Sequence, residues 1–242
     1  MTEKIKKFIL DNEDLINSNE WEEVYRKADI KLGLDKGRFT ETLLRASIHP
    51  EYYLEHIPKF FLFESDIKSF SIPNHITSID ESAFHSCSSL IDIEIPSNIT
   101  SIGNCAFYKC SSLTSMIIPD SVANIGYSAF SSCQSLADVV IGNSVEIIND
   151  YAFSWCRSLL SIDIPESVKS IGGSAFSSFG SLRSVRINNP QIRLDPYVFG
   201  DCDDLAITFN GTKAQWKDIA KGKFSGVTYI CTCIDGILKK SR

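Results

Sequence analysis

Residues 118–140 read IPDSVANIGYSAFSSCQSLADVV, and this 23-residue unit recurs along most of the chain. Each copy is recognised by a phenylalanine 23 positions after the previous one, and the six are Phe84, Phe107, Phe130, Phe153, Phe176 and Phe199. A fixed period of this length is typical of a solenoid, in which each unit buries its apolar side only against its neighbours. The period therefore predicts an α/β repeat solenoid, a stack of similar turns.

Other positions keep the same period around each phenylalanine. A leucine follows six residues later, and a branched aliphatic residue stands five residues before. Three residues after the phenylalanine, Phe179 takes the place in the fifth copy and a cysteine takes it in the others: Cys87, Cys110, Cys133, Cys156 and Cys202. Because this position accepts either cysteine or phenylalanine, we expect it to be a packing position in the core, where the cysteines are buried free thiols.

Each unit divides into a strand half and a return half. In the strand half, Ile93 and Ile95 alternate with Asp92 and Glu94, so the isoleucines should face the core and the carboxylates the solvent. The return half contains Ala-Phe-x-x-Cys, whose spacing by three indicates a short helix or 3₁₀ turn. The glycine before it, such as Gly126, suits a turn conformation.

The segments on either side of the repeats do not keep the period. Residues 1–62 predict a helical N-terminal region or cap, whose fourth helix contains Ile57. Residues 63–210 hold a leading strand and the six units, the last of which lacks one residue after Leu205. Residues 211–242 predict a C-terminal cap with one helix and one strand. Caps cover the exposed core and strand edge, and a poor one would permit self-association through a solenoid edge.

The repeats resemble the BspA-like class of leucine-rich repeats, with the pattern Ile-Pro-x-x-Val-x-x-Ile-Gly-x-x-Ala-Phe-x-x-Cys-x-x-Leu-x-x-Ile. One copy matches it at Ile118, Pro119, Val122, Ile125, Gly126, Ala129, Phe130, Cys133, Leu136 and Val139. The match covers roughly residues 67–210. The resemblance implies a right-handed leucine-rich-repeat solenoid with a parallel sheet on one face. It also implies a bacterial protein, since family members are often bacterial surface proteins that bind host proteins or other cells.

Composition limits the partners and the location. Of the 242 residues, 43% are hydrophobic and 22% are charged, which is ordinary for a soluble globular chain. The net charge of −6 makes a nucleic acid an unlikely partner, because such binding needs a basic surface. No apolar stretch is long enough to span a membrane, and the run from Phe8 to Leu10 is too short for a signal peptide. We therefore expect a cytoplasmic protein, with the cell surface as the alternative.

No constellation of side chains predicts catalysis, a cofactor or a metal. The pair Cys231 and Cys233 lacks the spacing and the second pair of a zinc site. An enzyme, the least favoured alternative, would need a site in the N-terminal region built from His49, Glu51, Glu55 and His56. The sequence therefore predicts a non-enzymatic protein.

A concave strand face is the first candidate for binding another protein. Its outward residues are Asp92, Glu94, Ile117, Asp138, Val140, Asp163, Arg183 and Arg186. The face is acidic at its N-terminal end and in the middle, and the arginines make its C-terminal end positive. Ile117 and Val140 should form an exposed apolar spot. The alternative is an ordinary solvated sheet.

An aromatic return edge is the second candidate. Its rings stand at variable positions of the return halves, at Tyr108, Tyr127, Tyr151, Trp155 and Tyr197. Exposed aromatic residues are over-represented at interfaces. The alternative is that these rings cover neighbouring repeats. Either surface would suit a protein-interaction scaffold that sequesters or inhibits a macromolecular target; the alternative function is a bacterial surface adhesin that binds a host protein.

Overall fold

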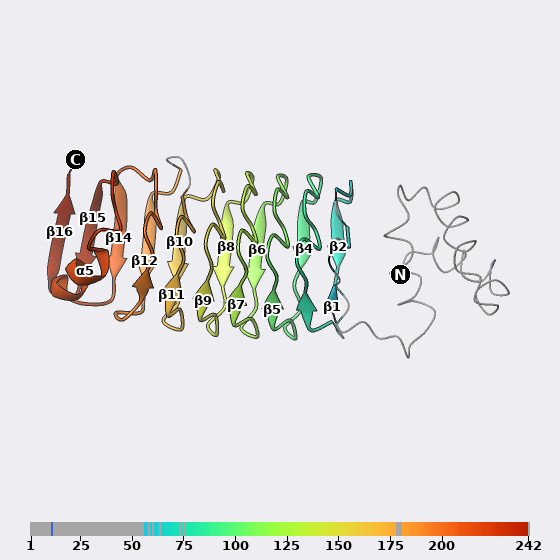
Figure 1. The fold of residues 1–242 in the computed structure, drawn as a ribbon, viewed down its shortest axis with the longest axis horizontal. Coiled ribbons are helices and arrows are strands. Elements are labelled where there is room, and N and C mark those ends of the chain that lie inside the picture. Colours follow the sequence, from blue (N-terminus) through green and yellow to red (C-terminus); the bar gives the residue numbers. More distant parts are fainter. Residues whose placement is uncertain are drawn as a thin grey trace. The chain divides into compact units, whose positions relative to one another are not determined.

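The computed structural model describes most of the chain from residue 56 onward. The described residues are Asp11, 56–57, 59, 61–62, 64–72, 74, 76–177 and 181–241. The chain divides into two compact units, Met1–Leu54 and Glu55–Arg242. Of the first unit only Asp11, which is helical, is described, so the other predicted N-terminal helical residues up to 55 lie outside the described residues. The second unit is a stack of turns that runs from β1 to β16 in Figure 1.

One side of the stack carries seven parallel strands in the order β1-β3-β5-β7-β9-β11-β13. Each is two residues long: β1 His56–Ile57, β3 Ser78–Ile79, β5 Ser101–Ile102, β7 Asn124–Ile125, β9 Ile147–Ile148, β11 Ser170–Ile171 and β13 Arg193–Leu194. The return halves supply these strands, so the solenoid has a second sheet beyond the one expected. Two residues are too few to produce an alternating pattern in the sequence.

The other side carries the longer strands of the strand halves. Their bounds are β2 Ser69–Ser71, β4 Asp92–Glu94, β6 Ser115–Ile118, β8 Asp138–Ile141, β10 Ser161–Ile164, β12 Ser184–Ile187 and β14 Leu205–Phe209. Backbone hydrogen bonds join β2 with β4, β6 with β8, and β10, β12 and β14 with the later strands β15 Tyr229–Cys233 and β16 Gly236–Lys240. The predicted repeat solenoid with parallel sheets is thus confirmed.

Neighbouring units stack in the register that the period predicts. Ile117 of β6 lies opposite Val140 of β8. In the last unit Ser184 lies opposite Ala206, one position short of the period, which confirms the missing residue. The alternation along the strands also holds, because Ile93 is buried between two exposed carboxylates.

The lattice phenylalanines form a stacked ladder through the core. From Phe84 to Phe176, successive ring centroids lie 5.0, 5.2, 5.1 and 5.3 Å apart and the rings are within 7° of parallel. Phe61 meets Phe84 edge-on at 6.2 Å at one end, and Phe224 lies 5.7 Å from Phe199 at the other. Offset aromatic pairs add about 0.5–1.5 kcal/mol each beyond the burial of their area.

The loop around each phenylalanine is a chain of turns, and the expected short helix or 3₁₀ turn is wrong. Positive φ occurs two positions before each lattice phenylalanine, and two positions after it wherever the structure describes that residue: Ser82, Ser86, Cys105, Lys109, Ser128, Ser132, Tyr151, Trp155, Ser174, Tyr197 and Asp201. This alternation turns every second N–H towards the adjacent unit. The N–H of Phe84 donates to the carbonyl of Ala106 at 2.7 Å, whereas that of His85 donates back to Ser82 at 3.2 Å.

The lattice cysteines hydrogen-bond to the phenylalanine one unit earlier. The Sγ atoms of Cys110, Cys133 and Cys156 lie 3.1, 3.1 and 3.2 Å from the carbonyl oxygens of Phe84, Phe107 and Phe130. Burial raises the pKa of Cys156 to about 12 and also raises the pKa of Cys133. These thiols are buried and neutral. Phe179, which takes the same slot in the fifth unit, lies outside the described residues.

The glycine of the return half lies where the backbones of two units approach closely. Gly126 does not have a positive φ, so a turn conformation that favours glycine does not explain why glycine occupies this position. A Cβ atom on Gly126 would lie 2.5 Å from the carbonyl carbon of Gly103. Only a residue without a side chain fits between these two backbones.

The repeat array begins earlier than the sequence suggests. Ile57, placed at the end of a helix by its spacing, lies instead in β1 opposite Ile79. Leu62 takes the place of a lattice phenylalanine: its N–H donates to Ala83 at 2.7 Å and its carbonyl accepts from the thiol of Cys87 at 2.8 Å. The described residues between Ile57 and Glu64 therefore belong to an additional return half. The sequence does not reveal it because it is one residue short of the period and has leucine in place of phenylalanine.

The C-terminal segment packs a helix and a hairpin on the last unit. Helix α5, Lys213–Ala220, begins after Thr212, whose side chain accepts from the N–H of Gln215. Trp216 of α5 is buried, with its ring 5.2 Å from Phe209 and 5.4 Å from Phe224. Strand β15 continues the parallel sheet beside β14, and β16 folds back antiparallel to β15.

Removing one ring from the ladder should strongly destabilise the second unit. Phe130 is fully buried and stacks on two neighbours, so Phe130→Ala should lower the free energy of unfolding by about 3–5 kcal/mol in urea denaturation. The control Ile117→Ala, at a side chain 67% exposed, should change it by less than about 0.5 kcal/mol. Equal midpoints for the two variants would contradict the ladder's structural role.

The lattice thiols should resist alkylation in the folded protein. The thiolate is the reactive form, and burial with a raised pKa suppresses it in Cys133 and Cys156. We expect iodoacetamide at pH 8 to modify half-buried Cys105 first, and the lattice cysteines only after unfolding in urea. Peptide mass spectrometry over time gives the order of modification. Equal rates at Cys105 and Cys133 in the folded protein would contradict the packing described here.

Candidate protein-binding surfaces

The strand face presents the outward column that alternation predicts. All eight residues proposed for this face are exposed: Asp92, Glu94, Ile117, Asp138, Val140, Asp163, Arg183 and Arg186. Ile117 and Val140 lie opposite one another in β6 and β8, with exposed fractions of 67% and 57%. Two adjacent aliphatic side chains thus stand in the middle of a largely acidic face.

Charges at the C-terminal end of this face are partly paired. Arg186 lies opposite Asp163, with 3.6 Å between Nε and the carboxylate oxygen, and both side chains are more than half exposed. The amide of Asn188 donates to the same carboxylate at 2.6 Å. An exposed ion pair of this kind contributes little stability, so both groups can exchange partners at small cost.

Two further apolar side chains on this side were missed by the sequence reasoning. Ile91 and Leu160 stand directly before β4 and β10 and are 47% and 60% exposed. They belong to the same column as Arg183, one position before the strand. Their exposure could have been predicted from the sequence, because Ile91 and Leu160 each directly follow a lattice leucine and so stand at a position that the repeat does not bury.

The aromatic residues of the return halves contact side chains of their own and of adjacent units. Tyr127 and Tyr151 come from adjacent units and meet edge-on with centroids 5.7 Å apart. Tyr108 is half-buried, with its ring 4.9 Å from His85 and 5.3 Å from the Lys109 ammonium. Burial, and then the charge of Lys109, lower the pKa of His85, so this group carries a neutral imidazole at neutral pH.

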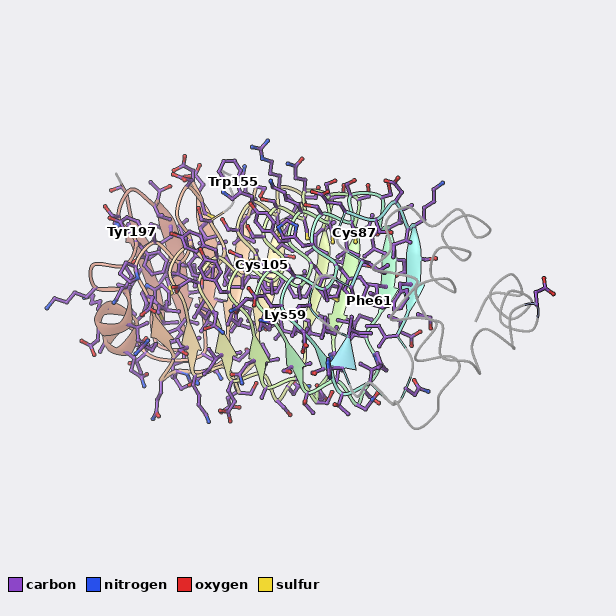
Figure 2. All side chains as sticks on the ribbon, turned by 45° about the vertical axis from the view of Figure 1, so that its right-hand side comes forward. Lys59, Phe61, Cys87, Cys105, Trp155 and Tyr197 are labelled. Carbon is purple, nitrogen blue, oxygen red and sulfur yellow. The ribbon has the colours of Figure 1, made fainter. Side chains whose placement is uncertain are left out.

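Trp155 and Tyr197 lie apart from one another. Figure 2 shows Trp155 at the upper edge of the stack and Tyr197 nearer its C-terminal end. The guanidinium of Arg157 lies 5.2 Å from the centroid of the Trp155 ring, and Tyr197 is 57% exposed. Trp155 and Tyr197 therefore stand at different places along the stack.

Three of the five rings occupy left-handed backbone positions. Tyr151, Trp155 and Tyr197 have φ angles of 57°, 63° and 60°. Equivalent positions of other units hold mostly serine, at Ser82, Ser86, Ser128, Ser132 and Ser174. A left-handed conformation costs an L-residue roughly 1–2 kcal/mol, and it is least common for bulky residues. Aromatic residues at these positions are poor choices for the fold alone.

The described residues do not assemble a metal site. Among residues 56–241 that the structure describes, no three His, Cys, Asp or Glu side chains converge to hold a metal ion. The thiols of Cys231 and Cys233 lie 3.6 Å apart and are buried. His56 lies 3.7 Å from the carboxylate of Asp80. The other residues of the enzymatic alternative, His49, Glu51 and Glu55, lie outside the described residues.

Comparison with known families agrees with the geometry. A family model described as the BspA type leucine rich repeat region, with six copies, matches residues 34–137, 87–206 and 125–231. The chain belongs to this family of leucine-rich repeat proteins. No curated protein matches the chain. Within the part of the chain that the structure describes, no helix has the length and apolar character to cross a membrane.

The comparison with solved structures finds bacterial leucine-rich repeat proteins. A leucine-rich cell surface protein from Faecalibacterium prausnitzii A2-165 is 26% identical with a TM-score of 0.54, covering 66% of this chain and 52% of that protein. A leucine-rich repeat protein from T. pallidum is 25% identical with a TM-score of 0.49, covering 64% of this chain and 82% of that protein. The chain thus spans about half the length of the F. prausnitzii protein.

Replacing a strained aromatic residue should leave stability nearly unchanged. Serine occupies the place of Trp155 in other units, so Trp155→Ser should alter the free energy of unfolding by less than about 1 kcal/mol. A buried tryptophan replaced by a small residue would cost about 3–5 kcal/mol. Urea denaturation separates these cases, with Trp216→Ser as the buried control. A loss above about 2 kcal/mol for Trp155→Ser would mean that the ring stabilises the fold.

Proposed function

We propose that the chain is a non-enzymatic scaffold that binds another protein. The observation that carries this proposal is the placement of exposed Tyr151, Trp155 and Tyr197 at left-handed positions where most other units have serine. Strained residues of this kind concentrate at functional sites, and Tyr and Trp are enriched among residues that dominate binding energy. Repeat solenoids supply extended surfaces for such contacts.

The strand face supplies a second contact surface within the same proposal. Ile117 and Val140 form an apolar centre, flanked by the carboxylates of Glu94 and Asp163. Apolar side chains inside a charged rim are the usual anatomy of a protein interface. The acidic rim favours a basic partner, which would be steered towards it by charge.

The biological role that we propose is sequestration or inhibition of a macromolecular target in the cytoplasm. A rigid stack presents its side chains without rearrangement, so little conformational entropy is lost on binding. A scaffold that offers two binding surfaces acts by occupying its target.

An affinity capture from the native lysate tests the proposal. We expect the wild-type chain to retain a specific protein, and Tyr151→Ser/Trp155→Ser to lose it at least about tenfold. Ile117→Asp tests the strand face in the same way. The matched control is Ile147→Ser, at an exposed aliphatic residue of the seven-stranded sheet. Retention by all variants, or capture of no protein, would contradict the proposed surfaces.

A surface adhesin is the second candidate function. It is favoured by the similarity to the F. prausnitzii protein, which is described as a cell surface protein. Its ligand would be a host protein bound by the same rings and strand face. Protease treatment of intact cells distinguishes the two: loss of the chain favours the adhesin, and full protection favours the cytoplasmic scaffold.

A further inference from the structure

The outward face of the strand sheet continues onto the C-terminal hairpin. Strands β10, β12, β14, β15 and β16 form one sheet, and residues that lie opposite one another in it point to the same side. In the hairpin Ile230 lies opposite Lys239, and Thr232 lies opposite Ile237. Ile230 and Ile237 are 48% and 59% exposed. The hairpin therefore adds a second exposed apolar pair to the strand face.

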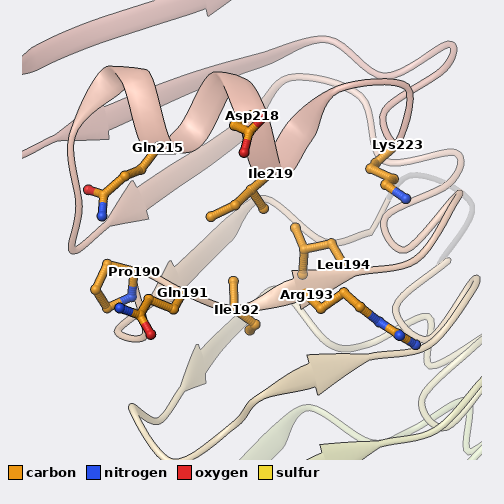
Figure 3. A pocket seen from close by; sticks show the side chains of 9 residues that line it. All are labelled: Pro190, Gln191, Ile192, Arg193, Leu194, Gln215, Asp218, Ile219 and Lys223. Carbon is orange, nitrogen blue, oxygen red and sulfur yellow. The ribbon is translucent and has the colours of Figure 1, made fainter.

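The last strands of the two sheets differ in what covers them. Beside β13, Figure 3 shows Ile219 of α5 directed towards Ile192 and Leu194, and the latter two are buried. The outward side of β15 and β16 is open instead, because every outward side chain of these two strands is exposed. The C-terminal end of the strand face is therefore free to receive a partner.

The charged side chains of the strand face are ordered along the stack. From β4 to β16, residues that lie opposite one another form two outward rows, since β4 neighbours β6 and β8 neighbours β10. In these rows the acids come first and the bases last: Asp92, Glu94, Asp138, Asp163, Arg186 and Lys239. Apart from the two apolar pairs, the other positions hold only Ser, Thr or Ala. The face is thus complementary in charge to itself when it is turned end for end.

We propose that a second copy of the chain packs on this face, so that the acidic half of each copy covers the basic end of the other. The two-fold axis runs parallel to the strands, between β10 and β12. Identical surfaces that meet about such an axis form a closed dimer and not a filament. The inference rests on the strand face of the proposed function, and it names the partner of that face.

This axis brings opposite charges together. Strand β16 of one copy lies over β4 of the other, which sets Lys239 against Asp92. Strand β12 lies over β10, which sets Arg186 against Asp163. Within its own chain Arg186 lies 3.6 Å from Asp163, and an exposed pair of this kind exchanges partners at small cost.

The two remaining acids meet no like charge. Glu94 faces Ile237 of the other copy and lies beside Lys239, two residues further along the same strand. Asp138 faces an alanine of β14, one strand away from Arg183. Like charges in direct contact would oppose association, and this register contains none among the acids.

The apolar side chains also meet. Strand β15 of one copy lies over β6 of the other, so Ile117 enters the space bounded by Ile230, Thr232 and Ile237. The short side chains between the apolar pairs allow the two sheets to approach. Apolar contacts inside a charged rim are the usual anatomy of a protein interface.

The size of the face suits a weak dimer. Eight strands from β4 to β16 span about 34 Å, and the four residues of a typical strand span about 13 Å. Two such faces bury a total of about 1,000 Å², near the lower limit for a specific interface. We therefore expect a dissociation constant in the micromolar range.

Sedimentation equilibrium of the purified full chain tests the proposal. The average mass should rise from one chain towards two between about 1 µM and about 500 µM, and high salt should weaken the dimer. Lys239→Asp and Asp92→Lys should each weaken it at least about tenfold, because the symmetry creates two like-charged pairs per dimer. Lys239→Asp/Asp92→Lys exchanges the charges and should restore the affinity to within about threefold. The matched control Lys217→Asp, at an exposed site of α5 outside the face, should leave it unchanged.

Three results would overturn the proposal. One is a single-chain mass at every concentration, and another is a double variant that dimerises no better than the single ones. The third is a dimer that survives Ile117→Asp, which would place the contact at another surface such as the free edge of β16. Because no lysate protein takes part, each of these results leaves capture of a target by Tyr151 and Trp155 untouched. Dimerisation that persists in Tyr151→Ser/Trp155→Ser would separate the two functions.

Discussion

Every turn of this solenoid must superimpose on the next, because two interactions at the phenylalanine require the same spacing. The ring of Phe84 stacks on Phe107 at 5.0 Å, and its N–H donates to the carbonyl of Ala106 at 2.7 Å. Both contacts operate near the spacing of adjacent strands, about 4.8 Å. A change of loop length would break the stack and the ladder together. The backbone of the loop is therefore repeated from unit to unit, including its left-handed residues, and the side chains are free to vary only where they face solvent.

That constraint separates structural columns from functional ones. Inward columns hold similar residue types because each side chain must fit the unit before it, as the ring of Phe130 does against Phe107. Outward columns carry no such requirement, so a large side chain there needs a further reason, such as a contact between neighbouring units or the binding of a partner. Tyr151 meets Tyr127 of the adjacent unit and Trp155 meets Arg157, yet both rings stand at a backbone conformation that is unfavourable for a bulky residue, where the neighbouring units have serine. Ile117 is distinguished by its exposure alone.

The features that follow from period and alternation were predictable, and those that depend on unpatterned contacts were not. The buried phenylalanines, the shortened last unit and the pairing of Ile117 with Val140 all follow from spacing. The return half around Leu62 was missed because it breaks the period and lacks the aromatic marker. The meeting of Tyr127 with Tyr151 was also missed, because they stand at different positions of their units and touch only across the stack. The left-handed φ angles of the return halves could not be predicted, because serine, unlike glycine, is not typical of that backbone conformation.

The two sheets are terminated in different ways, and the difference has a physical logic. Strand β16 runs antiparallel, which reverses the bonding pattern, and its exposed Lys239 and Lys240 disfavour a further strand. A helix instead stands beside the last strand of the seven-stranded sheet, where it shields apolar side chains without pairing the backbone of Leu194. Leu194 is buried, so the helix covers an edge that it does not pair. Because each strand of this sheet is only two residues long, covering the edge in this way leaves few backbone groups unpaired, whereas the longer strands are closed by the hairpin of β15 and β16.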